Sequence, residues 1–84
     1  MVTKALTITN KEGLHLRPTG KLCEAIYKYK SKIEIVYHSK TINAKSVLSV
    51  LSAGIDHGEE IVVVCAGEDE REALETFEKT LAEL

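Results

Sequence analysis

The chain has 84 residues, of which 44% are hydrophobic and 29% are charged, and its formal net charge is −2. These values are typical of one small globular domain over residues 1–84, which buries too little surface for a deep catalytic cleft. The negative charge, without a basic stripe interleaved with aromatic residues, argues against binding of nucleic acid.

A strand and a helix are predicted in the first third of the chain. Residues 2–8 alternate apolar and polar side chains, which indicates a strand, and residues 10–13 form a turn. A helix then runs to about Tyr29, with Pro18 in the first turn, where its missing N–H costs nothing. The residues at helical spacing that we expect to face a core are Thr19, Leu22, Cys23, Ile26 and Tyr29.

A hairpin and a short helix are predicted next. Strands are expected at residues 33–37 and 41–44, joined by a tight turn at 38–40. Ser46 is a suitable N-cap for a short helix over Val47–Ser52, because its hydroxyl can accept from a backbone N–H of the first turn.

A fourth strand and a last helix complete the chain. Residues 60–66 are almost continuously apolar, and residues 68–70 place negative charge at a helix start, where the helix dipole favours it. The order β-α-β-β-α-β-α implies a four-stranded sheet with helices on one face, which is an α+β fold. The stripe that the last helix should bury consists of Ala73, Leu74, Phe77, Leu81 and Leu84.

Several classes of site and location are not expected. No apolar run approaches the ~18 residues of a membrane span, and the N-terminus lacks the apolar core of a signal peptide, so we expect a cytoplasmic protein without membrane insertion. Cys23 and Cys65 lack metal-binding or CxxC spacing, so we expect two buried thiols and no metal site or cofactor. His38 and His57 fall in predicted turns and should be solvated.

The stretch over residues 13–20 carries the chemistry. His15 directly precedes the predicted helix start, where unpaired backbone N–H groups and the helix dipole favour an anion. A neutral imidazole there could accept a phosphoryl group, with its charge stabilised by the Leu16 and Arg17 amides and the Arg17 guanidinium. The alternative is that His15 only caps the helix beside a surface arginine.

Three segments resemble the HPr family, the histidine-containing phosphocarrier proteins of the bacterial phosphotransferase system. Residues 8–18 resemble its active-site signature, residues 43–51 followed by Gly54 and Ile55 resemble its regulatory-serine segment, and residues 67–70 match the approach to its last helix. The resemblance implies an open-faced β-sandwich, with an antiparallel sheet and three helices on one side.

The resemblance also implies a function. His15 would accept a phosphoryl group at Nδ1 from phosphorylated enzyme I and donate it to the IIA domain of a sugar permease. Arg17 would contact the phosphate. The protein would be a carrier rather than an enzyme.

Ser46 matches a serine that a kinase phosphorylates in some members of the family, which then act with a transcriptional regulator in catabolite repression. A phosphate at a helix N-terminus gains amide and dipole stabilisation, and Lys45 is adjacent. The alternative is that Ser46 is only an N-cap. A serine kinase or phosphatase and a regulator are therefore further candidate partners.

A docking surface is expected beside His15. Val47, Leu48 and Leu51 cannot all point inward from so short a helix, and exposed apolar residues near a reactive group often mark a binding surface. The resemblance makes these residues, together with Gly20, the surface for enzyme I and IIA. The alternative is that one or two of them complete the core.

Glu12, Leu16, Thr19 and Gly20 depart from the commoner family pattern, which bears on the choice of partners. The chain could instead act in a nitrogen-related phosphorelay or as a regulatory binding module without phosphorylation of His15. Such a module would be expected to lack the histidine.

Apolar residues are also expected on the open side of the sheet. If alternate residues of the fourth strand face the helices, Val62 and Val64 face outward near Val36 and Ala5. This predicts a protein that is mostly monomeric with a weak tendency to dimerise. The alternative is that these are ordinary scattered surface residues.

Overall fold

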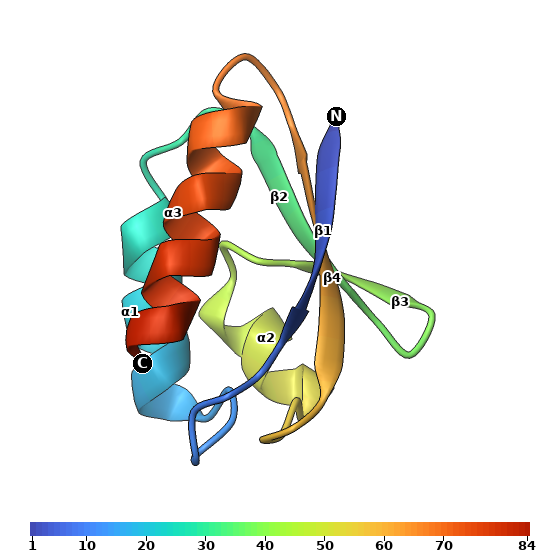
Figure 1. Ribbon diagram of the computed structural model, residues 1–84, viewed down its shortest axis with the longest axis vertical. Helices are drawn as coiled ribbons and strands as arrows, with labels where there is room; N and C mark the ends of the chain where they lie inside the picture. Colours follow the sequence, from blue (N-terminus) through green and yellow to red (C-terminus); the bar gives the residue numbers. More distant parts are fainter.

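A computed structural model describes all residues, 1–84, and its elements follow the predicted order. The strands pair antiparallel throughout in the order β1-β4-β2-β3, and the three helices lie on one face of the sheet (Figure 1). The open-faced β-sandwich is therefore confirmed. The elements are β1 (Val2–Thr7), α1 (Leu16–Ile26), β2 (Lys32–Tyr37), β3 (Lys40–Asn43), α2 (Val47–Ala53), β4 (Glu60–Ala66) and α3 (Glu70–Glu83).

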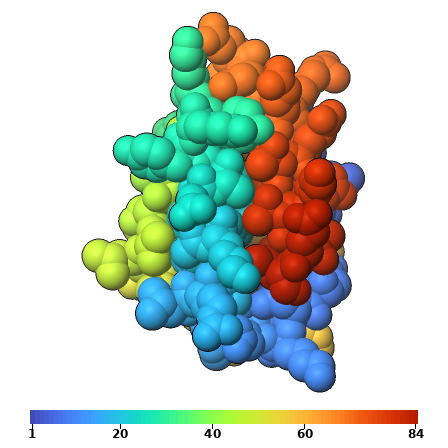
Figure 2. All heavy atoms as spheres, turned by 90° about the vertical axis from the view of Figure 1, so that its left-hand side faces the viewer, coloured from blue at the N-terminus to red at the C-terminus, as the bar shows by residue number.

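The core lies between the sheet and the helices, which run side by side across the face seen in Figure 2. The cross-strand pairs Ile33–Cys65 and Ile35–Val63 join the two central strands, and all four residues are buried. Phe77 of α3 is fully buried in the same hydrophobic cluster. Each such side chain contributes about 1.5–3 kcal/mol through burial, so the central strands and α3 supply much of the stability.

Both cysteines are free and buried, as the sequence predicts. Burial raises the pKa of the Cys23 and Cys65 thiols. The Cys23 Sγ donates to the Ala44 carbonyl at 3.1 Å, which ties α1 to the segment that leads into α2.

Helix α1 is shorter than predicted. It ends at Ile26 rather than near Tyr29, and the Tyr27 amide closes it by donating to the Cys23 carbonyl. Tyr29 lies beyond the helix, where its hydroxyl bonds the Thr76 hydroxyl of α3 at 2.5 Å. Tyr29 lies in a loop but still packs against the core, so the helical spacing of apolar residues in the sequence extends beyond the end of the helix.

Asp69 explains why the chain leaves α1 at this point. Its carboxylate accepts from the Lys30 and Ser31 amides, both at 2.9 Å, and from the Ser31 hydroxyl. It makes no side-chain cap bond within α3, so its main role is to join the α1–β2 connection to the start of α3. These hydrogen bonds, with that from the Ser31 hydroxyl the largest, lower the pKa of Asp69 from 3.8 to about 2.

Replacing Asp69 should therefore change how stability depends on pH. Because its pKa is lower in the folded chain, the stabilisation is present above pH 3.8 and is lost as the pH falls through 2. Asp69→Asn should lower stability at neutral pH and lose less of it on acidification, as measured by urea unfolding at pH 6 and at pH 2.5. Glu68→Gln, which removes a charge from the same loop but keeps Asp69, should retain the acid loss. An equal acid loss in Asp69→Asn would contradict this role.

The face of the sheet opposite the helices carries the apolar row that the sequence predicts. Val62 pairs with Ala5 on one side and with Val36 on the other, and Val64 pairs with Thr3 and Glu34. The three valines are only half-buried. Weak dimerisation through this face stays a prediction, which sedimentation at high protein concentration can test.

Candidate functional site

The site is built on a turn that lies directly against another loop. Gly13 has a φ of +65°, and a Cβ at this position would lie 2.8 Å from both the Asp56 Cα and the Ile55 carbonyl oxygen. The Leu14 amide donates to the Ile55 carbonyl at 2.9 Å, and the Leu14 side chain is buried. The Asn10 side-chain Nδ2 closes the turn by donating to the Gly13 carbonyl at 2.6 Å. The chain therefore enters α1 fixed to residues 54–59.

His15 lies at the N-cap position of α1 with an exposed side chain. Its backbone is extended, with φ −82° and ψ −172°, and its carbonyl accepts the first helical bond, from the Thr19 amide. The imidazole makes no side-chain cap bond, and 67% of the side chain is exposed. No capping hydrogen bond therefore supports the alternative that the His15 side chain only caps the helix. The imidazole is accessible to another molecule.

The first turn of α1 presents two free amides. The Leu16 and Arg17 N–H groups have no hydrogen-bond partner within the chain, and Pro18 has no N–H. The Arg17 side chain is exposed and forms no ion pair. Backbone donors, the positive end of the helix dipole and a free guanidinium are therefore available next to the imidazole.

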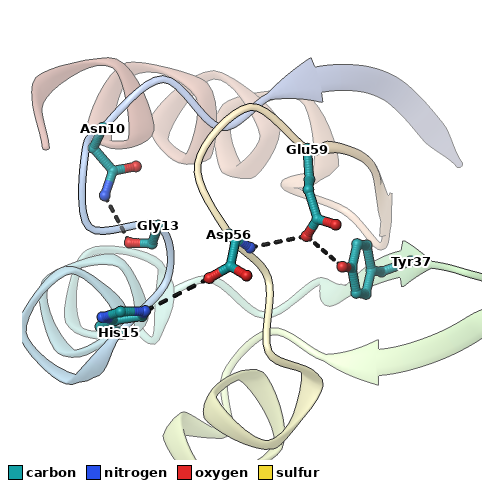
Figure 3. A network of polar contacts seen from close by, with 6 residues as sticks. All are labelled: Asn10, Gly13, His15, Tyr37, Asp56 and Glu59. Atoms are coloured by element: carbon teal, nitrogen blue, oxygen red, sulfur yellow. Dashed lines mark hydrogen bonds and ion pairs between the residues drawn. The ribbon is translucent and has the colours of Figure 1, made fainter.

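A chain of polar contacts approaches His15 from the 54–59 loop (Figure 3). The His15 Nε2 lies 3.7 Å from the Asp56 carboxylate, in the ion-pair range but longer than a hydrogen bond. The Glu59 carboxylate accepts from the Asp56 amide at 2.9 Å and from the Tyr37 hydroxyl. These bonds, led by that from the Asp56 amide, lower the pKa of Glu59, and the bond to Glu59 raises the pKa of Tyr37 to about 12.

Helix α2 places Ser46 and the predicted docking residues. Ser46 is its N-cap, as predicted, and its hydroxyl accepts from the Ser49 amide at 3.2 Å. Leu48 points outward with 76% of its surface exposed, whereas Leu51 is half-buried and Val47 packs against the core. The apolar set of α2 is thus divided between surface and core.

On α1, the exposed apolar surface comes from residues around His15. Leu16 is 68% exposed. A Cβ at Gly20 would meet no atom within 4 Å, so this part of the helix is open. Helices α1 and α2 pack against each other, so Leu16, Gly20 and Leu48 belong to adjoining helices (Figure 2).

No group of three or more histidine, cysteine, aspartate or glutamate side chains is arranged to hold a metal ion. None of the helices has the length and apolarity needed to cross a bilayer. His38 and His57 are exposed, as predicted.

Comparison with known proteins assigns the family. The profile described as the PTS HPr component phosphorylation site matches residues 2–83. The chain belongs to the HPr family. It is 34% identical over 84 residues to the phosphocarrier protein HPr of Buchnera aphidicola subsp. Schizaphis graminum, with 100% of this chain and 99% of that protein covered.

Solved structures of this family have the same fold. HPr-C-His from Thermoanaerobacter tengcongensis superposes with a TM-score of 0.95 at 30% identity, covering 99% of this chain and 93% of that one. The Bacillus subtilis catabolite repression protein Crh, solved as a dimer with a swapped domain, gives a TM-score of 0.79 at 30% identity, covering 99% and 95%. The family of phosphocarriers of the phosphotransferase system is thereby established for this chain.

The sequence does not predict that Asp56, Glu59 and Tyr37 form a polar network beside His15. The first two lie in a segment that the sequence indicates only as a connection, and Tyr37 is expected simply on a core face. The only available signal is the resemblance of Gly54 and Ile55 to the family pattern, which does not extend to Asp56.

The contact of Gly13 with residues 55–57 can be tested by adding a methyl group. Gly13→Ala should destabilise the fold, because it combines a left-handed φ with a clash against backbone. Gly54→Ala is a matched control, since Gly54 has a φ of +66° but open space around its Cβ position. Urea unfolding should show a loss for Gly13→Ala that exceeds the control by about 1 kcal/mol or more. Equal losses would mean that the contact contributes nothing beyond the backbone conformation.

Proposed function

We propose that this HPr-family chain carries phosphoryl groups on His15. It accepts them from phosphorylated enzyme I and passes them to the IIA domain of a sugar permease, in the cytoplasm. The observation that carries the proposal is the exposed His15 imidazole beside two unpaired amides at a helix N-terminus. Family membership supports the same reading.

The chemistry is nucleophilic transfer stabilised by fixed donors. A ring nitrogen of neutral His15 attacks phosphorus, and the bond from phosphorus to the donor breaks, with its electron pair leaving on the donor. Phosphoryl transfer depends mainly on positioning and on stabilising charge on the phosphoryl oxygens. The Leu16 and Arg17 amides and the Arg17 guanidinium supply those donors. The chain acts as a carrier with a transient phosphohistidine, and it needs no cofactor of its own.

Reconstitution with a cognate enzyme I tests the carrier function. Incubation with enzyme I, phosphoenolpyruvate and Mg²⁺ should give an acid-labile, base-stable phosphate that is lost in His15→Ala and kept in His57→Ala. Arg17→Ala should slow transfer about tenfold to a hundredfold, the range for one charged hydrogen bond. Absence of label at His15 refutes the carrier function, and an unchanged rate in Arg17→Ala refutes the role of the guanidinium.

The partner-binding surface is proposed to consist of Leu16, Gly20, Val47, Leu48 and Leu51. Leu48 contributes the most exposed apolar area of the set, and Leu16 adds a second exposed side chain next to His15. Enzyme I and IIA would use this surface in turn, since each must bring its own phosphorylated group to the same ring. An apolar residue at the centre of such a contact often contributes more than 1 kcal/mol.

Truncating Leu48 should weaken binding while leaving the fold intact. Leu48→Ala should raise the KM for transfer from enzyme I about fivefold or more, with little change in the free energy of unfolding, because the side chain is 76% exposed. Tyr27→Ala removes a comparably exposed side chain, at 73%, from the other end of α1 and should leave KM unchanged. Equal effects of the two variants would place the docking surface elsewhere.

A regulatory role is the second candidate, favoured by the similarity to Crh and by the position of Ser46. A serine kinase would phosphorylate Ser46 at the start of α2, and the modified chain would bind a transcriptional regulator. The phosphate would also bring negative charge next to Leu48 and Val47, which opposes docking of acidic partners there. Labelling by such a kinase that persists in Ser46→Ala would refute this role. Nothing in the structure favours the nitrogen-related phosphorelay.

A further inference from the structure

We propose that Asp56 is a positioning residue for His15. Its carboxylate holds the ring proton on Nε2, so that the lone pair for phosphoryl transfer lies on Nδ1. The consequence for phosphoryl transfer rests on the proposed carrier function, whereas the contact between Asp56 and His15 does not.

The ring and the carboxylate face each other along one edge of the imidazole. The Asp56 Oδ1 lies 3.7 Å from Nε2, and the other ring nitrogen lies on the side of the ring away from Asp56 (Figure 3). A carboxylate next to one nitrogen favours the tautomer that carries its proton there, because the N–H dipole then points at the negative charge. Nδ1 is left unprotonated and open to solvent.

The backbone of Asp56 is held by hydrogen bonds, whereas the only polar contact of its side chain is with the His15 ring. The Glu59 carboxylate accepts from the Asp56 amide, and the Glu59 amide donates to the Asp56 carbonyl at 3.2 Å. Tyr37, from the central strand β2, holds the Glu59 carboxylate in place. The Asp56 side chain is 72% exposed, and its only charged or hydrogen-bonding partner is His15. The carboxylate therefore acts on the His15 ring, and it makes no other polar contact that would stabilise the fold.

This arrangement lets transfer proceed without moving a proton. When Nδ1 attacks, the P–Nδ1 bond forms, the bond from phosphorus to the donor breaks, and the donor keeps that electron pair. The ring retains its Nε2 proton and becomes an imidazolium, whose positive charge faces the Asp56 carboxylate. When the acceptor attacks, the P–Nδ1 bond breaks and its pair returns to Nδ1. The ring is again neutral with the proton still on Nε2.

No other charged side chain competes for the ring. The segments next to the ring carry three charged residues, namely Glu12 of the preceding turn, Arg17 of α1 and Glu59 of the 54–59 loop. None of them forms an ion pair or a hydrogen bond with the His15 side chain. Because both His15 and Asp56 are exposed, solvent screens the pair. Removing the Asp56 carboxylate should therefore change the ratio of the two His15 tautomers about two- to fivefold, which corresponds to the interaction energies of exposed charge pairs.

The direct test is ¹⁵N NMR of the unphosphorylated protein, labelled at histidine, at a pH where the ring is neutral. The Nδ1 and Nε2 shifts give the fraction of each tautomer. The Nε2-protonated fraction of His15 should exceed that of the exposed His57 in the same spectrum. The tautomer ratio should fall about two- to fivefold in Asp56→Ala and be partly restored in Asp56→Glu. Equal ratios for His15 in the wild type and in Asp56→Ala would overturn the proposal.

A charge-matched control separates this contact from general electrostatics. Glu68→Gln removes one negative charge from the β4–α3 loop, at the end of the molecule opposite the start of α1 (Figure 1), and should leave the His15 tautomer unchanged. If it changes the ratio as much as Asp56→Ala does, the effect comes from net charge and the positioning role fails.

A second readout uses phosphorylation of the protein by enzyme I. Asp56→Ala should slow phosphoryl transfer from phosphorylated enzyme I to His15 about two- to fivefold, because the imidazolium that forms loses its counter-charge. If enzyme I never labels His15, the carrier function fails while the tautomer result stands on its own. If His15 is labelled but Asp56→Ala alters neither the tautomer nor the transfer rate, only the role of Asp56 fails.

Discussion

The site depends on one close backbone contact. Gly13 lies so near to residues 55–57 that no side chain fits between them, and the Leu14–Ile55 hydrogen bond fixes the two segments in register. This contact sets the direction in which the chain enters α1 and thus the place of the His15 ring. It also brings the loop after α2 to the start of α1. Because Gly13 has no Cβ, these two segments can approach closely enough to form one site.

Around this contact, the groups proposed to take part in phosphoryl transfer are exposed and make few contacts within the chain. The core is formed by alternating strand residues and by Phe77, and neither the His15 nor the Arg17 side chain belongs to it. The Leu16 and Arg17 amides, the Arg17 guanidinium and the His15 ring are instead open to solvent. A domain this small cannot form a deep cleft, so the proposed site lies at a helix end, where a docked partner would exclude water.

Much of this architecture is readable from the sequence because it follows from local patterns. Alternation in residues 33–37 and the nearly continuous apolar run in residues 60–66 predict the central strands, and Pro18 after His15 predicts the start of α1. The end of α1 is not readable, because it depends on Asp69, a residue distant in sequence that captures the Lys30 and Ser31 amides. Asp56 is missed for the same reason, since its contact with His15 is created by tertiary packing.

The burial of both thiols has a practical consequence. Cys23 and Cys65 are at most 5% exposed, and burial disfavours their thiolate forms, which are the species that react with oxidants and alkylating reagents. Both native thiols should therefore react slowly with thiol reagents. A cysteine introduced at an exposed position should react much faster, so a spin label or fluorophore could be attached there to follow partner binding without removing the native cysteines.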